Sequence, residues 1–307
     1  MNLFKLFESR RNRESRGFLY SFVSVFFVAP VFIVASIVMK SMPAETASTM
    51  FFGAGFLITS VISTLRKRNR EVLPMVRKYF RPLLLLGIFN TSAAILFFTG
   101  IKSIGPSSAA FISRFETIFV ILLGVLLLKE KLGKMDMLGM AITVSGVIMV
   151  TYSNVSMVIG SFFIFASSAL ISFQRILLKK YVSKIQPMDL NQLRLFFSFV
   201  LLLSYVVLSS RLVMPSAGNL LLIGIVSLSA PVIGFYLRLK AMELIDVSKV
   251  MTVESLEPFI VVLMSIFLLG SITSPRQILG GGVMIVGITM LLMSHRMKGK
   301  EKSMPVN

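Results

Sequence analysis

Thirty-eight consecutive residues without Asp, Glu, Lys or Arg extend from Met137 to Gln174 and read MLGMAITVSGVIMVTYSNVSMVIGSFFIFASSALISFQ. A helix rises about 1.5 Å per residue, so roughly 20 apolar residues cross the hydrocarbon core of a bilayer. The run is therefore long enough for two membrane-spanning helices. Tyr152-Ser153-Asn154 is the expected turn between them.

The rest of the chain has the same apolar character. Apolar residues make up 55% of the 307 residues and charged residues only 15%, whereas about 25% of a soluble domain is charged. A soluble protein of this length could not bury so much apolar surface in one core. The sequence predicts an all-α polytopic membrane protein with ten transmembrane helices, at residues 17–40, 44–65, 81–101, 106–129, 135–152, 155–180, 187–210, 216–241, 247–270 and 275–295.

The formal net charge of +19 is distributed unevenly between the two sides of the predicted bundle. Of the 32 Lys and Arg residues, 26 fall in the two tails and in the loops on the same side, and four fall on the opposite side. Such an excess is typical of cytoplasmic loops. We therefore expect a multi-pass protein of the cell membrane with both termini in the cytoplasm. The charge then indicates topology and contact with lipid headgroups, and no nucleic acid is expected as a partner.

The two halves of the sequence resemble each other. A shift of 141 residues places Phe115-Glu116-Thr117-Ile118 over Leu256-Glu257-Pro258-Phe259, and a shift of 144 residues places Pro43 over Pro187. We therefore divide the chain into two repeats of five helices each, residues 1–152 and 153–307. Because five is odd, the second repeat must insert upside down relative to the first. Inverted repeats are typical of transporters, in which they permit alternating access to a central site.

Several short motifs resemble a known repeat. The first half contains Gly105-Pro106-Ser107-Ser108-Ala109-Ala110, Phe115-Glu116, Leu128-Lys129-Glu130-Lys131-Leu132, Gly139 and Gly146, and the second half contains Leu256-Glu257-Pro258, Gly280 and Gly287. Together they resemble the EamA repeat of the drug/metabolite transporter superfamily. The resemblance implies a carrier of small solutes, often an exporter, with a central cavity from which the fifth and tenth helices stand apart. Thr117 replaces a usual Pro, and Ser271 occupies the position of Glu130 in the second half, so Glu130 is not assigned a transport role.

Ionisable residues inside the predicted helices are the candidate functional residues, because charges are costly to bury in a membrane. Two pairs in oppositely directed helices, Arg114 with Glu116 and Glu254 with Glu257, lie about 11–15 Å from where their helices start. All four therefore reach the middle of the bilayer, where inverted-repeat carriers bind substrate. The predicted substrate-binding residues are Arg114, Glu116, Glu257, Glu254, Arg194, Asn90 and Tyr236. The alternative is a structural role, in which buried Arg–Glu pairs hold helices together.

Arg114 and Glu116 are two residues apart and must point to different faces of a helix. Glu257 and Arg194 are the expected partners for them. By contrast, residues near the cytoplasmic helix ends are expected to extend their polar groups to the membrane surface. These are Gln174, Arg175, Arg238 and Lys240.

The sequence thus predicts a secondary transporter that moves a small polar metabolite, an amino acid or an organic anion. The family resemblance implies that the direction is export. Protons are the candidate coupling ion, with Glu116 or Glu257 as the carrier of the proton. The alternatives are a membrane-embedded enzyme that modifies lipids, and a channel or scaffold. The chain has no Cys, no zinc motif and no Ser-His-Asp set, so we expect no catalytic residue, metal or cofactor. Its glycines lie in apolar helices and lack the context of a nucleotide site.

Overall fold

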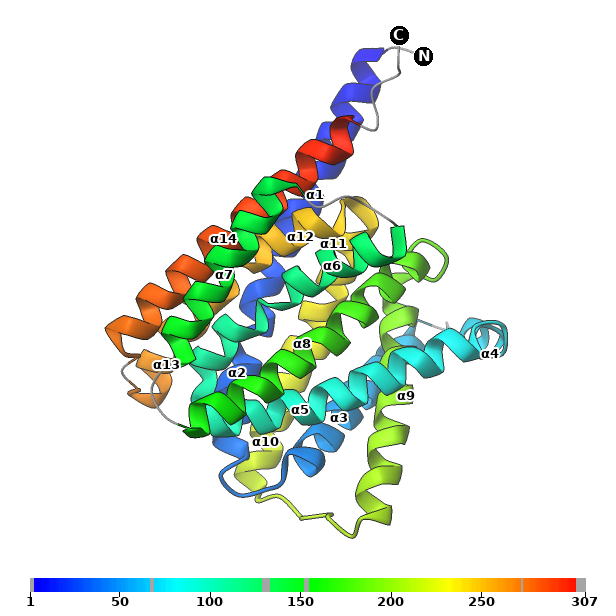
Figure 1. The fold of residues 1–307 in the computed structure, drawn as a ribbon. Coiled ribbons are helices and arrows are strands. Elements are labelled where there is room, and N and C mark those ends of the chain that lie inside the picture. Colours follow the sequence, from blue (N-terminus) through cyan, green and yellow to red (C-terminus); the bar gives the residue numbers. More distant parts are fainter. Residues whose placement is uncertain (1–2, 67–68, 129–132, 152–154, 272, 302–307) are drawn as a thin grey trace.

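The computed structural model describes residues 3–66, 69–128, 133–151, 155–271 and 273–301 (Figure 1). In these ranges the chain forms helices and no strand. The helices are α1 (Leu3–Val28), α2 (Pro30–Val38), α3 (Ala44–Leu65), α4 (Asn69–Lys78), α5 (Phe80–Ser113), α6 (Glu116–Leu128), α7 (Lys134–Thr151), α8 (Val155–Tyr181), α9 (Pro187–Leu208), α10 (Ala217–Ser227), the π-helix η1 (Leu228–Gly234), α11 (Phe235–Leu244), α12 (Val247–Glu254), α13 (Glu257–Leu269) and α14 (Pro275–Glu301). The predicted turn at 152–154, the boundary between the predicted repeats and Glu130 lie outside the described residues.

Eight segments of the described chain are long and apolar enough to cross a membrane. Two of the ten predicted helices are not counted separately among them. The predicted helices 81–101 and 106–129 belong to one segment, Phe80–Gly124, and α7 is not among the eight. The ten predicted helices otherwise match the observed segments in order and approximate extent. The fold is therefore an all-helical bundle of the predicted class.

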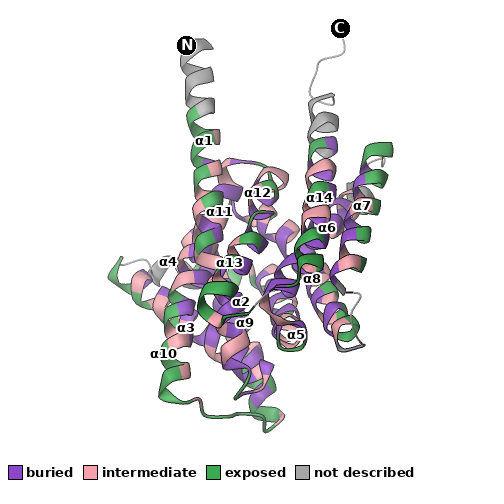
Figure 2. Ribbon diagram, turned by 90° about the vertical axis from the view of Figure 1, so that its left-hand side faces the viewer, coloured by how far each residue is buried: buried purple, intermediate pink, exposed green. Residues whose placement is uncertain are grey.

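The outer surface of the bundle is apolar, as a bilayer requires. Exposed side chains include Leu208 at 86%, Phe267 at 81% and Phe162 at 67% of their full surface. Asn191 and Glu254, in contrast, are at most 1% exposed. Figure 2 shows this distribution, with buried residues lining the interior of the bundle and exposed residues on the outward faces of the helices. Polar groups are thus collected in the centre, where they satisfy one another instead of facing lipid.

The fourth predicted helix is unusual because α5 continues into it through a sharp bend. Gly105 has φ 77° and ψ 167°, a backbone conformation that side chains with a Cβ rarely adopt. Pro106 follows and has no N–H to donate to the preceding turn. The two residues redirect the chain without a connecting loop. They bring Arg114 and Glu116 into the bundle on the far side of the bend.

Two other membrane segments contain proline-related irregularities. α1 and α2 meet at Ala29, directly before Pro30. The eighth predicted helix is α10, η1 and α11 in succession, with Pro231 inside the π-helical turn. The carbonyl oxygen of Pro231 accepts a hydrogen bond of 2.6 Å from the side chain of Asn191. π-Helical turns occur often at functional sites, and Pro231 lines the cavity described below.

Two helix boundaries differ from the predictions, and one additional helix is present. The first helix begins at Leu3 instead of residue 17, and the last ends at Glu301 instead of residue 295. The basic segment 66–80, which lies between two of the predicted helices, contains the ten-residue helix α4. Apolar length defines only the part of a helix inside the membrane, so these polar extensions could not be predicted from it. Figures 1 and 2 show that α1 and α14 project from the same end of the bundle.

The fifth and tenth membrane helices, α7 and α14, pack against each other through matched glycines. A Cβ on Gly146 would lie 2.6 Å from the carbonyl oxygen of Gly280, and a Cβ on Gly287 would lie 2.6 Å from that of Gly139. Small residues at these four positions allow the two backbones to approach closely. Neither helix contributes a residue to the cavity lining. The pair therefore stands apart from the site, as the resemblance implied.

Candidate functional site

Two broken helices build the centre of the site. α5 ends at Ser113 and α6 begins at Glu116, and in the second repeat α12 ends at Glu254 and α13 begins at Glu257. The shift of 141 residues relates Glu116 to Glu257. Each carboxylate therefore stands at the first residue of a half-helix, where the backbone N–H groups and the helix dipole favour negative charge. Discontinuous helices at equivalent positions of inverted repeats are typical of transporter binding sites.

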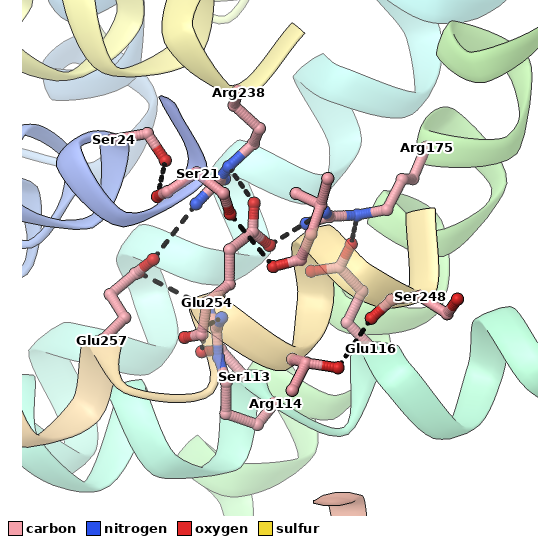
Figure 3. Close-up of polar contacts among 12 residues, drawn as sticks. Ser21, Ser24, Ser113, Arg114, Glu116, Arg175, Arg238, Ser248, Glu254 and Glu257 are labelled. Carbon is pink, nitrogen blue, oxygen red and sulfur yellow. Dashed lines mark hydrogen bonds and ion pairs between the residues drawn. The ribbon is translucent and has the colours of Figure 1, made fainter. Parts of the chain in front are cut away.

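A network of buried ion pairs joins the two breaks (Figure 3). Arg175 of α8 bridges the repeats, because its Nε contacts Glu116 and its Nη1 lies 2.8 Å from Glu254 Oε2. Arg238 of α11 is 2.5 Å from Glu254 Oε1 through Nε and 3.1 Å from Glu257 Oε2 through Nη2. The shorter Arg238 contact lacks hydrogen-bond geometry, whereas the longer one is a hydrogen bond. Four membrane segments are thus held together through three carboxylates.

Arg114 completes this network from the turn between α5 and α6. Its Nη2 lies 3.4 Å from Glu257 Oε1, and its Nη1 donates a hydrogen bond of 3.0 Å to the backbone oxygen of Glu254. The second contact satisfies a carbonyl at the end of α12, which has no partner within its own helix. Glu257 and Arg194 were the expected partners of Arg114 and Glu116, and the structure contains the pair of Arg114 with Glu257. Glu116 contacts Arg175 instead of Arg194.

The expectation that Arg175 and Arg238 extend to the membrane surface is wrong. Arg175 is 4% exposed and the side chain of Arg238 is 12% exposed. Their chain positions near helix ends suggested an interfacial location, but the buried carboxylates of Glu116 and Glu254 hold both guanidinium groups inside. Gln174, at 4% exposed, is also buried and donates a hydrogen bond of 2.8 Å to Asn90 Oδ1.

Lys240, in contrast, remains partly exposed. Its Nζ lies 3.0 Å from Glu243 Oε2, in a pair whose side chains are 33% and 35% exposed. Of the four residues expected at the membrane surface, Lys240 has the most exposed side chain.

Arg194 of α9 differs from the other buried arginines in its surroundings. Its guanidinium donates to Asn90 Oδ1 at 3.1 Å and to Asn191 Oδ1 at 2.9 Å. The guanidinium carbon lies 3.6 Å from the ring centre of Phe235 and 5.9 Å from that of Phe52. Both hydrogen-bond acceptors are neutral amides, and the two rings supply cation–π contacts. Within the described chain, Arg194 Nε has no hydrogen-bond partner.

A cavity of about 160 Å³ lies between these groups. Five of the predicted substrate-binding residues line it, namely Arg114, Glu116, Glu257, Arg194 and Asn90. Arg238 and Gln174 also line it, although the sequence pointed to neither. The remaining wall, apart from Ser113, is apolar and includes Phe32, Phe51, Phe52, Phe97 and Phe98. The cavity therefore combines charged groups with an aromatic wall.

Two predicted site residues lie elsewhere. Glu254 is 1% exposed and lies behind the lining, where it contacts Arg175 and Arg238. Tyr236 lines a separate depression with Arg66 and Lys240. Its place on α11, two residues before Arg238, turns it away from the cavity. In the described part of the chain, no group of three His, Cys, Asp or Glu side chains is arranged to hold a metal ion.

Comparisons with known proteins agree with this architecture. The model of the EamA-like transporter family matches residues 15–152 and 158–293. No curated protein matches the chain. One solved structure, described only as "Crystal structure of protein", is similar with a TM-score of 0.68 and 15% sequence identity. The similarity covers 92% of this chain and 98% of that chain, and at this identity it shows the fold alone.

Proposed function

The chain belongs to the EamA-like transporter family of the drug/metabolite transporter superfamily, and we propose that it is a secondary carrier of a small polar metabolite. The family consists of membrane transporters, not enzymes. The proposed substrate is an amino acid or an organic anion, the proposed direction is export, and the proposed location is the cell membrane with both termini in the cytoplasm. Alternating access is the proposed mechanism.

One observation carries this proposal, the pair of broken helices that meet at a charged cavity. Glu116 and Glu257 begin the second halves of two equivalent helices, and both carboxylates line the cavity with Arg114, Arg194 and Arg238. A substrate in this cavity touches both repeats at once. A change in the relative position of the repeats then exposes the substrate to the other side of the membrane.

The ion-pair network supplies the contacts that such a change must rearrange. Arg175 contacts one carboxylate from each repeat, Glu116 and Glu254. Separation of the repeats on this side of the cavity requires at least one of these contacts to break. Because unpaired buried charges are strongly unfavourable, the carboxylates must find other partners in the opposite conformation. Substrate groups or protons are suited to that role.

Proton coupling is the proposed energy source. A carboxylate that loses its guanidinium partner in a dehydrated site takes up a proton more readily. Glu116 and Glu257 are the proposed proton carriers because each lines the cavity and each contacts arginine. A cycle in which one of them exchanges its arginine for a proton would couple transport to the proton gradient.

Counterflow tests the proposal directly. The full-length protein is reconstituted into liposomes that are preloaded with an excess of a single unlabelled amino acid or monocarboxylate. Uptake of a trace of the same labelled compound from outside is then followed without a pH gradient or a membrane potential. A carrier with an alternating site shows transient accumulation that depends on preloading, and we expect this result for the true substrate class. Uptake that is insensitive to preloading would identify a channel, and a chemically altered compound would identify an enzyme.

A further inference from the structure

The buried charges of the site do not balance. Four arginines, Arg114, Arg175, Arg194 and Arg238, lie within the centre of the bundle with three glutamates, Glu116, Glu254 and Glu257. Every one of these glutamates contacts at least one guanidinium. Arg194 contacts none of them, and its acceptors in the described chain are two amide oxygens. The site therefore carries one excess positive charge when all seven groups are ionised.

An uncompensated guanidinium at mid-membrane is unfavourable unless a ligand compensates it. The residues around Arg194 hold it in place without neutralising it. Asn90 Oδ1 accepts from both Arg194 and Gln174, while Asn90 Nδ2 donates to Ser198 at 2.8 Å. The Phe235 ring stacks on the guanidinium face at 3.6 Å. A positive group that is fixed in orientation and lines the cavity is suited to receive an anion.

We propose that Arg194 binds the anionic group of the substrate, and that this carrier therefore takes organic monoanions in preference to amino acids. The inference rests on the proposed function and narrows its substrate class. An amino acid would also need an acceptor for its ammonium group. Glu254 and Glu257 each contact two guanidinium groups, and Glu116 is held by Arg175. An ammonium would have to compete with an arginine that is already in place.

The rest of the cavity wall indicates the size and polarity of the group attached to the anionic carboxylate. Five phenylalanines from α2, α3 and α5 line it, and two of them, Phe32 and Phe97, pack edge to face with ring centres 5.0 Å apart. A volume of about 160 Å³ is close to that of an engineered apolar cavity of about 150 Å³ in another protein that binds benzene. The matching ligand is a carboxylate attached to an apolar group of about the size of one ring or a short alkyl chain.

Pairs of compounds that differ only in the amino group test this inference. Thermal unfolding of the purified full-length protein is measured with 3-phenylpropanoate against phenylalanine, and with hexanoate against norleucine, while 3-phenylpropanamide serves as the uncharged analogue. A ligand that binds the folded state raises the unfolding temperature. We expect the carboxylates to raise it with apparent Kd values at least tenfold lower than those of the amino acids and the amide.

Two variants and one control assign the effect to Arg194. Arg194→Gln should raise the apparent Kd of the carboxylates at least tenfold, whereas Arg211→Gln should leave it unchanged, because Arg211 pairs with Glu45 on the surface. Asn90→Asp keeps the shape of the side chain but places a carboxylate 3.1 Å from Arg194 Nη1. This variant removes the excess charge, so it should fold and should also lose anion binding at least tenfold, even if Arg194→Gln does not fold.

The outcomes separate the inference from the proposed function. Tighter binding of the amino acids, equal binding of the amide, absence of binding by the carboxylates, or unchanged binding in Asn90→Asp would overturn the anion site. Carboxylates that bind through Arg194 but show no counterflow would overturn the carrier function and leave the anion site standing. Counterflow of an amino acid without carboxylate binding would overturn the anion site and leave the carrier function standing.

Discussion

Glu116 and Glu257 occupy equivalent positions in two helices that cross the bundle in opposite directions, yet they contact different arginines. Glu116 contacts Arg175 of α8, whereas Glu257 contacts Arg114 and Arg238. The two acids are related by the internal repeat of the chain, whereas the arginines that they contact are not. Exchange of the conformations of the two repeats would therefore not reproduce the same ion pairs. Under the proposed alternating-access mechanism, the two conformations would be stabilised by different contacts.

Glu254 should contribute more to stability than any surface acid. Glu254→Gln leaves Arg175 and Arg238 each without one carboxylate contact. Loss of one partner from a buried ion pair destabilises by about 3–5 kcal/mol. The matched control is Glu45→Gln, whose partner Arg211 is 57% exposed, and a surface pair contributes about 0–1 kcal/mol. In detergent, the unfolding temperature of Glu254→Gln should be well below that of Glu45→Gln. Equal unfolding temperatures would contradict a structural role for Glu254.

Proton coupling predicts a separate effect for the two cavity acids. Glu116→Gln and Glu257→Gln remove the groups that would take up and release the proton. In proteoliposomes, at least one variant should lose accumulation driven by an imposed pH gradient, down to the level of liposomes without protein. Counterflow at equal pH should persist in that variant and shows that it is folded. Normal pH-driven accumulation in both variants would exclude these residues as the proton carriers.

The close contact between α7 and α14 is testable with two glycines of one helix. A Cβ on Gly287 would meet the oxygen of Gly139 at 2.6 Å, whereas a Cβ on Gly282 would meet nothing within 4 Å. Gly287→Ala must push the two backbones apart, and overpacking of this kind costs about 1–3 kcal/mol. Gly282→Ala should be neutral or stabilise by up to about 1 kcal/mol, because alanine favours the helix. Similar unfolding temperatures for the two variants would contradict the packing.

The sequence was sufficient to predict the fold because the membrane helices and the two repeats each have their own sequence pattern. Apolar length marked the membrane helices, and the repeated Glu116 and Glu257 motifs marked the two halves. The irregular details had no such pattern. The continuation of α5 through Gly105 depends on a single positive φ, and α4 lies in a segment whose basic composition is equally typical of a loop. Local propensity could not distinguish these alternatives.

The candidate site was predicted in part for a related reason. Depth along a helix placed Arg114, Glu116 and Glu257 near the middle of the membrane, and all three line the cavity. Depth could not identify Arg175 and Arg238, because their burial depends on carboxylates contributed by distant helices. The available signal for further buried arginines was the unequal number of acids and arginines inside the predicted membrane helices. Three acids required partners, and only two arginines had been assigned to the membrane interior.

Orientation in the membrane is the last prediction, and the absence of cysteine from the chain makes it accessible. Lys and Arg concentrate on the side that holds both termini, which predicts that this side is cytoplasmic. Ser103→Cys, an exposed position two residues before the bend of α5 at Gly105, should react with an impermeant thiol reagent added to intact cells. Asn69→Cys, at the start of α4, should react only after the cells are opened. Ala109→Cys, which replaces a fully buried residue, is the control that should not react in either case.

Labelling of residue 69 in intact cells and of residue 103 only in opened cells would reverse the orientation.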